Sequence, residues 1–429
     1  MLAPQSAIEE WKSYWFLPIA GALGYATSVI FVYALGPFIE PIEQEFGWSR
    51  QQISFGITIA SFTNALLCVP IGMLVDKIGP RKVGLAGILF MGAAFALLGT
   101  ATGSWSNWVM LWFVVAFAVL WIQATVWTSA VTSRFHHSRG FALAITLSGA
   151  SLSATIFPLI ATWIITHYDW RTGFMAMGIG WAAIVFPCLF FFFRSAKDKP
   201  KGNTQTDAVN PASLTGLSIK EGLRSGALYK LLLAGGFFAF TAIGIIVHYV
   251  PILTSYGTPR VEAAGIASLI GIFSIIGRLG TGFLLDRFPG FIVGGCAFLI
   301  PIAACALMLI DGSNTLYQML AAAIFGLTLG SEVDVIAYLA AKYFGLRNFG
   351  ALYGALVGAL TMGTAFGPLA AGAVFDNYGS YEVFLMLTAV LMGISAVALF
   401  TLGTTPSAEE HAQQKTIATS ERGVAGESI

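Results

Sequence analysis

The sequence predicts an all-α integral membrane protein, with twelve transmembrane helices arranged as two pseudo-symmetric six-helix bundles. Composition is the first reason: 57% of the 429 residues are hydrophobic and only 10% are charged, whereas a soluble domain carries about 25% charged residues. The second reason is that uncharged stretches near or above the roughly 20 residues needed to cross a bilayer recur along the chain. The third is that the two halves repeat each other's motifs.

The polar breaks between these stretches place the spans. The first follows the charged segment EEWKSYW and is too long for the core of a signal peptide, so we expect it to be retained. In order, the predicted spans are 16–39, 51–75, 83–104, 107–132, 140–166, 172–193, 228–255, 261–286, 290–310, 315–341, 349–375 and 380–403.

One polar segment interrupts the middle of the chain. It is rich in Gly, Ser, Thr and Pro, which is typical of a linker. The predicted organisation is therefore an N-terminal six-helix bundle over 1–193, a cytoplasmic linker over 194–227, a C-terminal six-helix bundle over 228–403 and a cytoplasmic tail over 404–429.

The distribution of Lys and Arg predicts the orientation. Short basic loops stay in the cytoplasm, and with the N-terminus inside, all but four of the 22 Lys and Arg residues are cytoplasmic. The exceptions are Arg50, Arg171 and Arg260 outside and Arg278 within a span. We therefore expect a multi-pass protein of the inner (cytoplasmic) membrane, with both termini in the cytoplasm.

The two halves echo each other at a nearly constant displacement. Gly72 and Asp76 in GMLVDKIGPRK reappear 210 residues later as Gly282 and Asp286 in GFLLDRFPG, and Pro158 reappears as Pro368. Duplicated halves are typical of secondary transporters, whose substrate site lies between the repeats near the bilayer midplane.

These motifs resemble those of the major facilitator superfamily over essentially the whole chain. GMLVDKIGPRK resembles the family's loop motif between the second and third helices, and QEFGWSRQQIS, SRGFALAITLSGASL and GRLGTGFLLDR resemble the branch of monocarboxylate transporters and oxalate:formate antiporters. The resemblance implies the major facilitator fold. It also implies that Asp76 with Arg81, and Asp286, act as conformational latches; the alternative is that they only anchor the topology.

Arg278 is a cation deep within a predicted span. It precedes Asp286, near the cytoplasmic edge, by eight residues, which places it about 12 Å deep and near the midplane. An arginine there costs about 2.5–3.5 kcal/mol by insertion measurements, so it implies a compensating partner or a substrate.

Two acids lie at a similar depth in the tenth span. Asp334 precedes Lys342 by eight residues, and Glu332 lies about half a turn further inward, on a different side of the helix. Our hypothesis is that Arg278 binds a substrate carboxylate while Asp334 or Glu332 carries a coupling proton, because ionised acid and substrate compete for one cation. Asp334 is favoured; a purely structural buried ion pair is the alternative.

Other residues are further candidates for the cavity, the gate and helix packing. We expect His248 in the outer vestibule or gate, or as a hydrogen-bonded structural histidine. Glycines at about four-residue spacing over 350–367 predict close helix packing. The polar and aromatic residues that are candidates for lining the cavity are Tyr25, Tyr33, Asn64, Trp127, Ser148, Ser151 and Thr155.

The resemblance and the residues together predict a transporter of a small organic monocarboxylate. Oxalate:formate antiporters have a lysine in the eleventh helix, where this chain has Leu356, and a single midplane cation favours a monocarboxylate over a dicarboxylate. A proton-driven exporter of amphipathic drugs and a carboxylate exchanger remain alternatives.

No enzyme motif, metal-ligand spacing or cofactor motif occurs in the sequence. We expect no catalytic residue, metal or cofactor, and no nucleic-acid partner. The expected partners are the organic anion, a proton and the lipid bilayer, with the protein functional as a monomer. The four cysteines lie in apolar spans and are expected to be small core residues.

Overall fold

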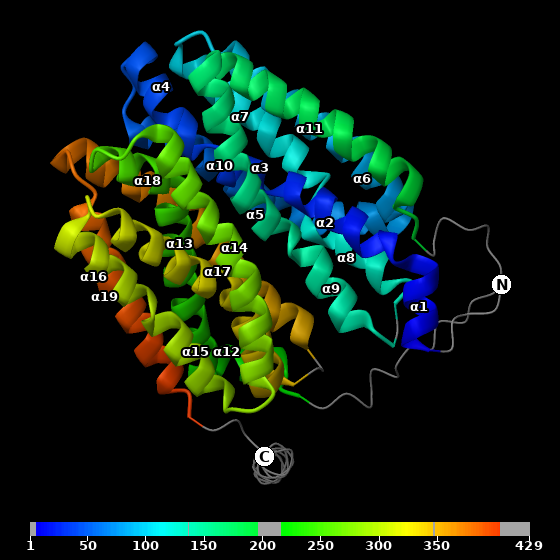
Figure 1. Ribbon diagram of the computed structural model, residues 1–429. Helices are drawn as coiled ribbons and strands as arrows, with labels where there is room; N and C mark the ends of the chain where they lie inside the picture. Colours follow the sequence, from blue (N-terminus) through cyan, green and yellow to red (C-terminus); the bar gives the residue numbers. More distant parts are fainter. Residues whose placement is uncertain (1–5, 136, 196–215, 346–347, 404–429) are drawn as a thin grey trace, which may run out of the picture.

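The computed structural model describes residues 6–135, 137–195, 216–345 and 348–403. These residues form helices, and the only strand-like pairing among them is one isolated bridge between Gly216 and Gly345. Figure 1 shows two bundles side by side, α1 to α11 in blue to green and α12 to α19 in green to red.

The first bundle contains eleven α-helices and one short 3-10 helix. They are α1 (Ala7–Tyr14), α2 (Phe16–Ser28), α3 (Ile30–Tyr33), α4 (Gly36–Phe46), α5 (Arg50–Ile78), α6 (Pro80–Leu97), η1 (Leu98–Thr100), α7 (Trp105–Leu120), α8 (Ala124–Thr132), α9 (Arg139–Leu147), α10 (Gly149–His167) and α11 (Trp170–Phe192).

The second bundle contains eight α-helices. They are α12 (Ile219–Arg224), α13 (Gly226–Ser255), α14 (Arg260–Leu285), α15 (Gly290–Leu299), α16 (Pro301–Asp311), α17 (Thr315–Phe344), α18 (Phe349–Tyr378) and α19 (Glu382–Phe400).

All twelve predicted spans coincide with helical segments. Within the described residues, ten helical segments are long and apolar enough to cross a membrane. The two predicted spans outside this set are the interrupted run α2 to α4 and the continuous helix α5. The chain is thus an all-α multi-pass membrane protein, and the predicted fold class is confirmed.

Local sequence signals explain where α5 begins and ends. The Ser49 hydroxyl accepts a hydrogen bond from the backbone N–H of Gln52, whose side chain accepts one from the backbone N–H of Ser49, so the two residues form a capping box. Gly79, at φ 96°, ends the helix in a conformation that L side chains rarely adopt. Pro80 then starts α6, at a position where its missing N–H costs nothing.

Two spans of the first bundle are broken at neighbouring places. The run α2 to α3 is interrupted at Val29, and α7 and α8 are separated at Trp121 to Gln123. The Trp127 indole N–H donates to the Ser28 hydroxyl and to the Ile122 carbonyl, both at 2.9 Å, and the Ser28 hydroxyl also donates to that carbonyl. The backbone oxygen freed by the break is therefore satisfied inside the protein, as a membrane interior requires.

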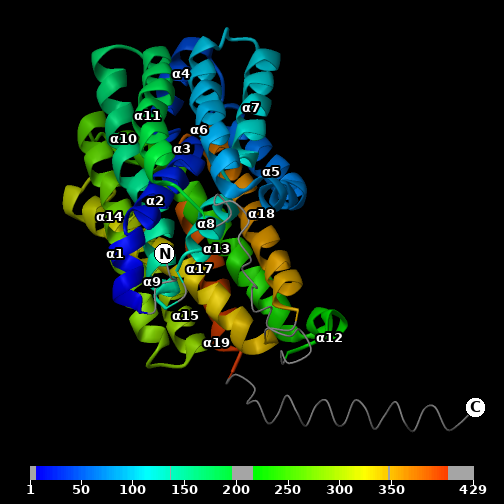
Figure 2. The same ribbon diagram turned by 90° about the vertical axis from the view of Figure 1, so that its right-hand side faces the viewer.

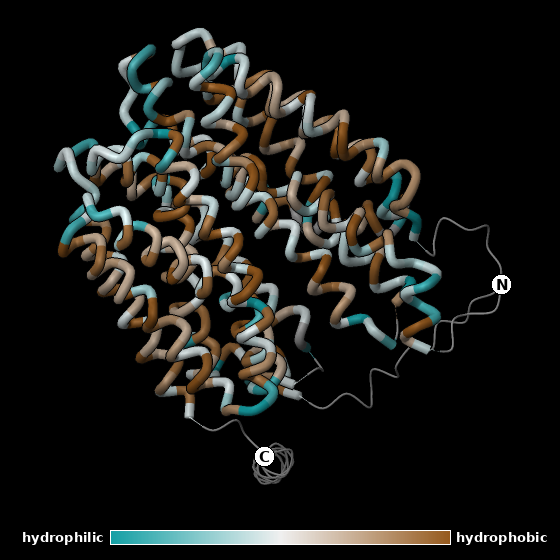
Figure 3. The backbone as a smooth tube through the Cα atoms, viewed as in Figure 1, coloured by the Kyte–Doolittle hydropathy of each residue, from teal (hydrophilic) through white to brown (hydrophobic). Residues whose placement is uncertain are grey.

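Each bundle has an aromatic and aliphatic core. Phe38 stacks on Phe174 in the first bundle with ring centroids 3.9 Å apart, and Phe238 packs on Phe298 in the second at 4.5 Å. Figure 2 shows the same bundles turned by 90°. The tube in Figure 3 is largely brown along the helices and teal near several of their ends, as expected for helices that cross a bilayer.

The bundles meet near one end of the molecule, which we call the closed end and define by Glu43, Arg50, Asp376 and Tyr381. Toward the opposite end, which we call the open end and define by the start of α9 and by Asp286, the ribbons diverge (Figure 1). In α18, a Cβ atom added at Gly354 or Gly358 would meet no atom within 4 Å.

The predicted glycine packing surface of α18 is therefore correct only in part. Gly363 and Gly367 pack against the backbone of α13, where a Cβ atom would lie 2.5 Å from the Gly236 oxygen or 2.0 Å from the Phe240 oxygen. Gly350, Gly354 and Gly358 lie toward the open end and have no such neighbour. The expectation of four core cysteines is also wrong, because Cys296 is exposed while Cys305 is buried.

Several sequence predictions lie partly or wholly outside the described residues. The tail from 404 and most of the linker, 196–215, belong to this group, as does the side chain of Asp76 in α5. The described end of the predicted linker belongs with the second bundle, because Leu217 N–H donates to the Phe344 carbonyl and the Asn348 side chain donates to the Leu217 carbonyl.

Candidate functional site

Arg278 and Asp334 form an ion pair inside the second bundle. The Nη1 atom of Arg278 lies 3.1 Å from Oδ1 and 3.3 Å from Oδ2 of Asp334. The Arg278 side chain is 12% exposed and the Asp334 side chain 30% exposed. The two residues that the sequence placed at equal depth are thus in contact, and the acid compensates the buried cation.

Backbone contact between α14 and α17 holds this pair together. A Cβ atom at Gly277 would lie 2.0 Å from the Leu327 oxygen, and one at Gly330 would lie 1.9 Å from the Ser274 oxygen. Because neither glycine has a side chain, the helices approach closely. The Thr281 and Ser331 hydroxyls, 2.5 Å apart, add a hydrogen bond beside the pair. The guanidinium is therefore held by a rigid helix pair.

One donor of the Arg278 guanidinium has no partner among the described residues. Asp334 contacts only Nη1, and Nε is buried without a hydrogen-bond partner among the described residues. A guanidinium presents its donors as a planar fork that matches a carboxylate. Nε is therefore a donor whose hydrogen bond a ligand carboxylate would supply.

Glu332 occupies a different environment on the same helix. It is buried, at 5% exposure, and forms no hydrogen bond or ion pair within the described part of the chain. The Glu332 carboxyl interacts electrostatically with the Arg278 guanidinium. The two acids of α17 therefore divide into one that is paired and partly open to solvent, Asp334, and one that is enclosed, Glu332.

Three tyrosines interact electrostatically with these charges. The charges of Arg278 and Glu332 act on the hydroxyl groups of Tyr25 and Tyr33, which come from α2 and α3 of the first bundle. Glu332 and Asp334 also act on Tyr353 of α18. The candidate site, defined as Arg278, Glu332, Asp334 and these three tyrosines, thus draws on both bundles. Sequence analysis missed Tyr353; its signal was the single hydroxyl-bearing aromatic residue in FGALYGALVG.

Trp127 does not line the site, and this prediction is wrong. The side chain is completely buried within the first bundle, where its ring lies against Gly24 and Gly84. Its indole N–H is used at the helix break described above. Trp127 is a core residue that supports that break.

Ser151 and Thr155 lie where α10 of the first bundle meets α14 of the second. The Ser274 hydroxyl donates to the Ser151 hydroxyl at 2.6 Å. A Cβ atom at Gly271 would lie 2.1 Å from the Thr155 hydroxyl. In this state both residues contact the opposite bundle, and Ser151 is buried. Among the described residues, the Ser148 hydroxyl donates to the Ala144 carbonyl, one turn earlier in the chain.

Asn64 lies partly buried on α5. Its Oδ1 atom is buried and has no hydrogen-bond partner among the described residues. A buried amide oxygen without a partner is costly, so Asn64 stays a candidate for contact with a ligand.

A cluster of hydrogen bonds and an ion pair holds the bundles together at the closed end, and it was not predicted from the sequence. The Asp376 carboxylate accepts hydrogen bonds from the backbone N–H groups of Arg50 and Gln51, each at 2.9 Å. The Arg50 guanidinium contacts Glu43 at 2.9 Å and donates to the Tyr381 hydroxyl at 2.9 Å. The signal that was available is that Arg50 and Arg260 depart from the positive-inside pattern; Arg260 pairs with Glu40 across the bundles at 3.1 Å.

His248 is fully buried beside this cluster, so it does not line an open vestibule in this state. Its Nδ1 atom lies 2.8 Å from the Tyr381 hydroxyl, and its Nε2 atom lies 3.0 Å from the Pro368 carbonyl and 3.1 Å from the Ser54 hydroxyl. Ser54 belongs to the first bundle. His248 is thus a hydrogen-bonded contact between the bundles.

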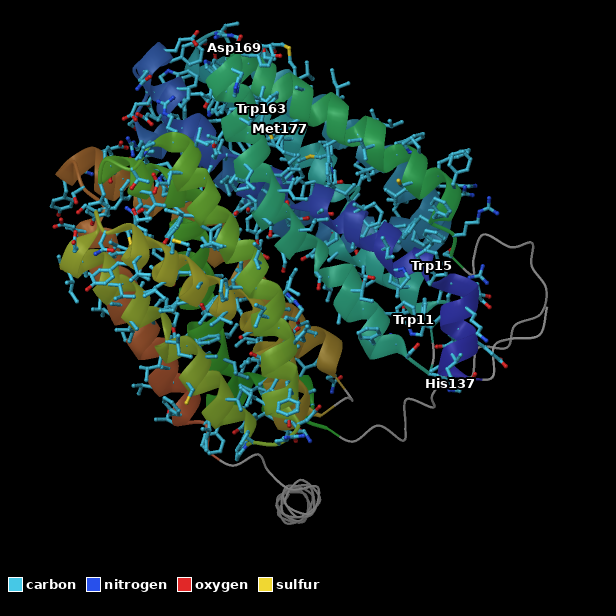
Figure 4. All side chains as sticks on the ribbon, in the orientation of Figure 1. Trp11, Trp15, His137, Trp163, Asp169 and Met177 are labelled. Carbon is cyan, nitrogen blue, oxygen red and sulfur yellow. The ribbon has the colours of Figure 1, made fainter. Side chains whose placement is uncertain are left out.

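The latch residues lie at the open end. The Arg81 guanidinium donates to the Phe190 carbonyl of α11 at 2.6 Å, within its own bundle. Asp286 follows α14 and is exposed. Nearby, the Glu10 carboxylate accepts hydrogen bonds from the backbone N–H groups of His137 and Ser138, so α1 is attached to the start of α9 (Figure 4 labels Trp11 and His137 there).

Within the described residues, no three His, Cys, Asp or Glu side chains gather in a way that could hold a metal ion. The chemistry offered by the candidate site is instead one guanidinium, two carboxyl groups and three phenolic hydroxyls. Groups of these types are chemically suited to binding an anion and to exchanging a proton.

Comparisons with known proteins agree with this architecture. Residues 21–356 match the sequence profile of the Major Facilitator Superfamily. An uncharacterised transporter of that type from Bacillus subtilis, YcxA, is 26% identical over 390 residues, covering 86% of this chain and 92% of its own. The probable sulfoacetate transporter SauU of Cupriavidus necator is 25% identical, covering 83% of this chain and 86% of its own.

Two further similarities are more distant. Monocarboxylate transporter 12 of Rattus norvegicus is 22% identical, covering 78% of this chain and 74% of its own. The crystal structure of a bacterial homologue of the human lysosomal transporter Spinster, inward-facing and unoccupied, superposes with a TM-score of 0.70 at 16% identity. It covers 90% of this chain and 96% of that one, and it shows a shared fold.

Proposed function

The chain belongs to the Major Facilitator Superfamily, and we propose that this transporter moves a small organic monocarboxylate across the cytoplasmic membrane by alternating access, together with a proton. The single observation that carries the proposal is the ion pair between Arg278 and Asp334. Its cation lies near the depth at which transporters of this plan bind substrate between their repeats.

Arg278 is the proposed ligand of the substrate carboxylate. Its Nε side has no partner among the described residues, so it can bind an incoming carboxylate without first breaking a bond. The hydroxyl groups of Tyr25 and Tyr33 lie within the field of the same cation and come from the opposite bundle. A ligand that bridges Arg278 and these tyrosines would draw the bundles together.

Asp334 is the proposed carrier of the coupling proton. An ionised Asp334 neutralises Arg278 and competes with the substrate, whereas a protonated Asp334 leaves the cation to the substrate. Binding of the proton and of the anion therefore favour each other, and linkage requires the effect to be reciprocal. Glu332, enclosed in the same helix, is the second candidate for this role.

The substrate class follows from the charge balance of the site. Arg278 is the cation of the site, and Leu356, which is 1% exposed, contributes no charge from α18. When Asp334 is protonated, this guanidinium carries one positive charge, which matches a ligand with one negative charge. Relatives named as monocarboxylate transporters and as a probable sulfoacetate transporter favour a small organic acid. Sulfoacetate, which carries two negative charges, belongs in the panel of test ligands as a check on this charge argument.

The closed end is proposed to face the outside. Lys77, Arg81 and Lys82 lie toward the open end, and basic residues near short loops remain in the cytoplasm. With this orientation both termini are cytoplasmic, and the state described here opens inward.

Ligand-induced stabilisation of the purified protein tests the proposal. We expect a monocarboxylate to raise the melting temperature more at pH 5.5 than at pH 7.5, and Arg278→Gln to abolish this effect. Arg287→Gln is the matched control, because Arg287 is an exposed cation that lies over the Phe283 ring. Uptake by Arg278→Gln at the wild-type rate in proteoliposomes would overturn the proposal.

The same panel of test ligands also distinguishes two other transport functions. Stabilisation by amphipathic cations, with no response to carboxylates, would favour a proton-driven exporter. Carboxylate binding with no pH dependence, combined with transport that requires a carboxylate on both sides, would favour an exchanger.

A further inference from the structure

His248 lies in a chain of hydrogen bonds whose direction is fixed by its two ends. At one end, the Arg50 guanidinium can only donate, so the Tyr381 oxygen accepts from it at 2.9 Å. At the other end, the Pro368 carbonyl can only accept, so Nε2 of His248 must carry a hydrogen at 3.0 Å.

The middle of the chain follows from these ends. With a hydrogen on Nε2, a neutral imidazole has a lone pair on Nδ1, which lies 2.8 Å from the Tyr381 hydroxyl. Tyr381 therefore donates its hydrogen to Nδ1. Donation runs without interruption from Arg50 to Tyr381, then to His248, and finally to the Pro368 carbonyl.

This chain joins the two bundles. Arg50 belongs to α5 of the first bundle, whereas Tyr381, His248 and Pro368 belong to the second. Ser54, one turn after Arg50, places its hydroxyl 3.1 Å from Nε2. The imidazole thus contacts both bundles, in a position with no exposed surface.

A second proton on His248 would break the chain. Nδ1 would then carry a hydrogen that points at the hydroxyl hydrogen of Tyr381. The Tyr381 hydroxyl could no longer donate to Nδ1 and would have to rotate away from it. The imidazole ring would also become a cation, and only the Tyr381 hydroxyl oxygen would lie between it and the Arg50 cation. Burial without a compensating partner makes such a charge costly.

The surrounding charges do not remove this cost. Arg50 is the charged group that acts on the imidazole. Of the acids nearby, Glu43 on α4 is occupied by the Arg50 Nε atom at 2.9 Å. Asp376 on α18 is occupied by the backbone N–H groups of Arg50 and Gln51.

We infer that closure of this end requires a neutral His248, so that a proton taken up by His248 holds the end open. The inference rests on the proposed alternating access. Opening separates Ser54 and Arg50 from the imidazole and gives protons access to it. The bundles close again there only when His248 has released the proton. His248 is thus a positioning residue whose protonation sets the orientation of the transporter, apart from the carboxylate site.

The distance between the bundles at this end tests the inference without any substrate. Spin labels would be attached through Thr102→Cys and Thr315→Cys, both exposed at the closed end, after replacement of the native Cys68, Cys188, Cys296 and Cys305 by serine. Pulsed electron paramagnetic resonance would then compare the distance distribution at pH 7.5 and pH 5.5. We expect the population with the longer distance to rise by about threefold or more in acid.

Variants identify the group that responds. In His248→Gln the amide can donate to Pro368 and accept from Tyr381 but cannot gain a proton, so we expect one distribution at both pH values. His248→Asn offers the same groups on a shorter side chain and serves if the glutamine variant does not fold. His167→Gln is the matched control, because it removes an exposed histidine whose ring contacts the Trp163 carbonyl of its own helix, and it should keep the acid response of the wild type.

Two results would overturn the inference. One is an unchanged wild-type distribution between the two pH values. The other is an acid response that persists in His248→Gln or disappears in His167→Gln. Neither depends on substrate binding, so a failure here is distinct from uptake by Arg278→Gln, which concerns the proposed function.

Discussion

Asp376 caps α5 from the other bundle: its Oδ1 atom accepts a hydrogen bond from the backbone N–H of Arg50 at 2.9 Å. Its Oδ2 atom accepts one from Gln51 at the same distance. A carboxylate at a helix N-terminus satisfies otherwise unpaired N–H groups and is favoured by the helix dipole. The contact that closes the molecule is thus also a helix cap.

Asp376→Ala should therefore open this end. Hydrogen bonds to a charged group contribute about 1.5–3 kcal/mol, so the closed population should fall by about tenfold or more relative to the open one. The spin-label distance between positions 102 and 315 measures this. Asn377→Ala is the control, because the exposed Asn377 side chain donates to the Ala373 carbonyl of its own helix and has no other partner in the described part of the chain. An equal shift in both variants would contradict the capping role.

Asp334→Asn should make the affinity for the monocarboxylate independent of pH. The asparagine is neutral at every pH, so Arg278 remains available and monocarboxylate affinity at pH 7.5 should approach the wild-type affinity at pH 5.5. Calorimetric titration at both pH values is the measurement. If Asp334→Asn keeps the pH dependence and Glu332→Gln loses it, the coupling proton belongs to Glu332.

Gly330→Ala should disrupt the helix pair that carries the site. The added Cβ atom would lie 1.9 Å from the Ser274 oxygen and 2.7 Å from the Arg278 nitrogen, so α14 and α17 must separate. Overpacking of this kind costs about 1–3 kcal/mol, which should lower the melting temperature by several degrees. Gly280→Ala, where no atom lies within 4 Å, should leave it unchanged or slightly higher. Equal melting temperatures of the two variants would refute the packing argument.

Glu45 should contribute to stability in a pH-dependent way. Partial burial raises the pKa of this carboxyl, but hydrogen bonds from Arg171 and Trp170 outweigh it, and the net pKa is lowered. A lowered pKa in the folded state means that the stabilisation is present above the unfolded pKa and is lost as the pH falls through the folded one.

Glu45→Gln should thus melt lower than the wild type near neutral pH, and the difference should shrink in acid. The effect is small because the pair is partly exposed. Melting curves from pH 7 down to about pH 3 would measure it. A difference that grows as the pH falls would have the wrong sign for this mechanism.

The fold followed from the sequence because lipid imposes one strong rule. A segment such as 228–255 has no charged side chain beyond its ends, and a helix is the structure that satisfies its backbone without water. Arg278 and Asp334 could be matched for the same reason: both lie in uninterrupted helices, where counting residues from a polar end measures depth. In the structure, the Arg278 Nη1 atom lies 3.1 Å from the Asp334 Oδ1 atom.

Residue counting failed where helices break or touch. Trp127 follows the interruption at Trp121 to Gln123, so the side of the helix on which it lies could not be carried over from the residues before the break. Ser151 was assigned to the cavity because it is polar, yet a serine also suits close contact between helices. The cluster at Arg50 was not predicted because Arg50 lies more than 300 residues away in the chain from Asp376 and Tyr381.

The unoccupied surroundings of Gly354 and Gly358 in α18 make this stretch of helix sensitive in a way that a melting curve would miss. A bulky side chain there fits the state described here, so the folded protein would lose nothing. If rocking brings the open-end halves of α5 and α18 together, the same side chain would act as a wedge. It would hold every molecule of a sample in one orientation, a useful property for raising conformation-specific antibodies or for trapping a complex for imaging.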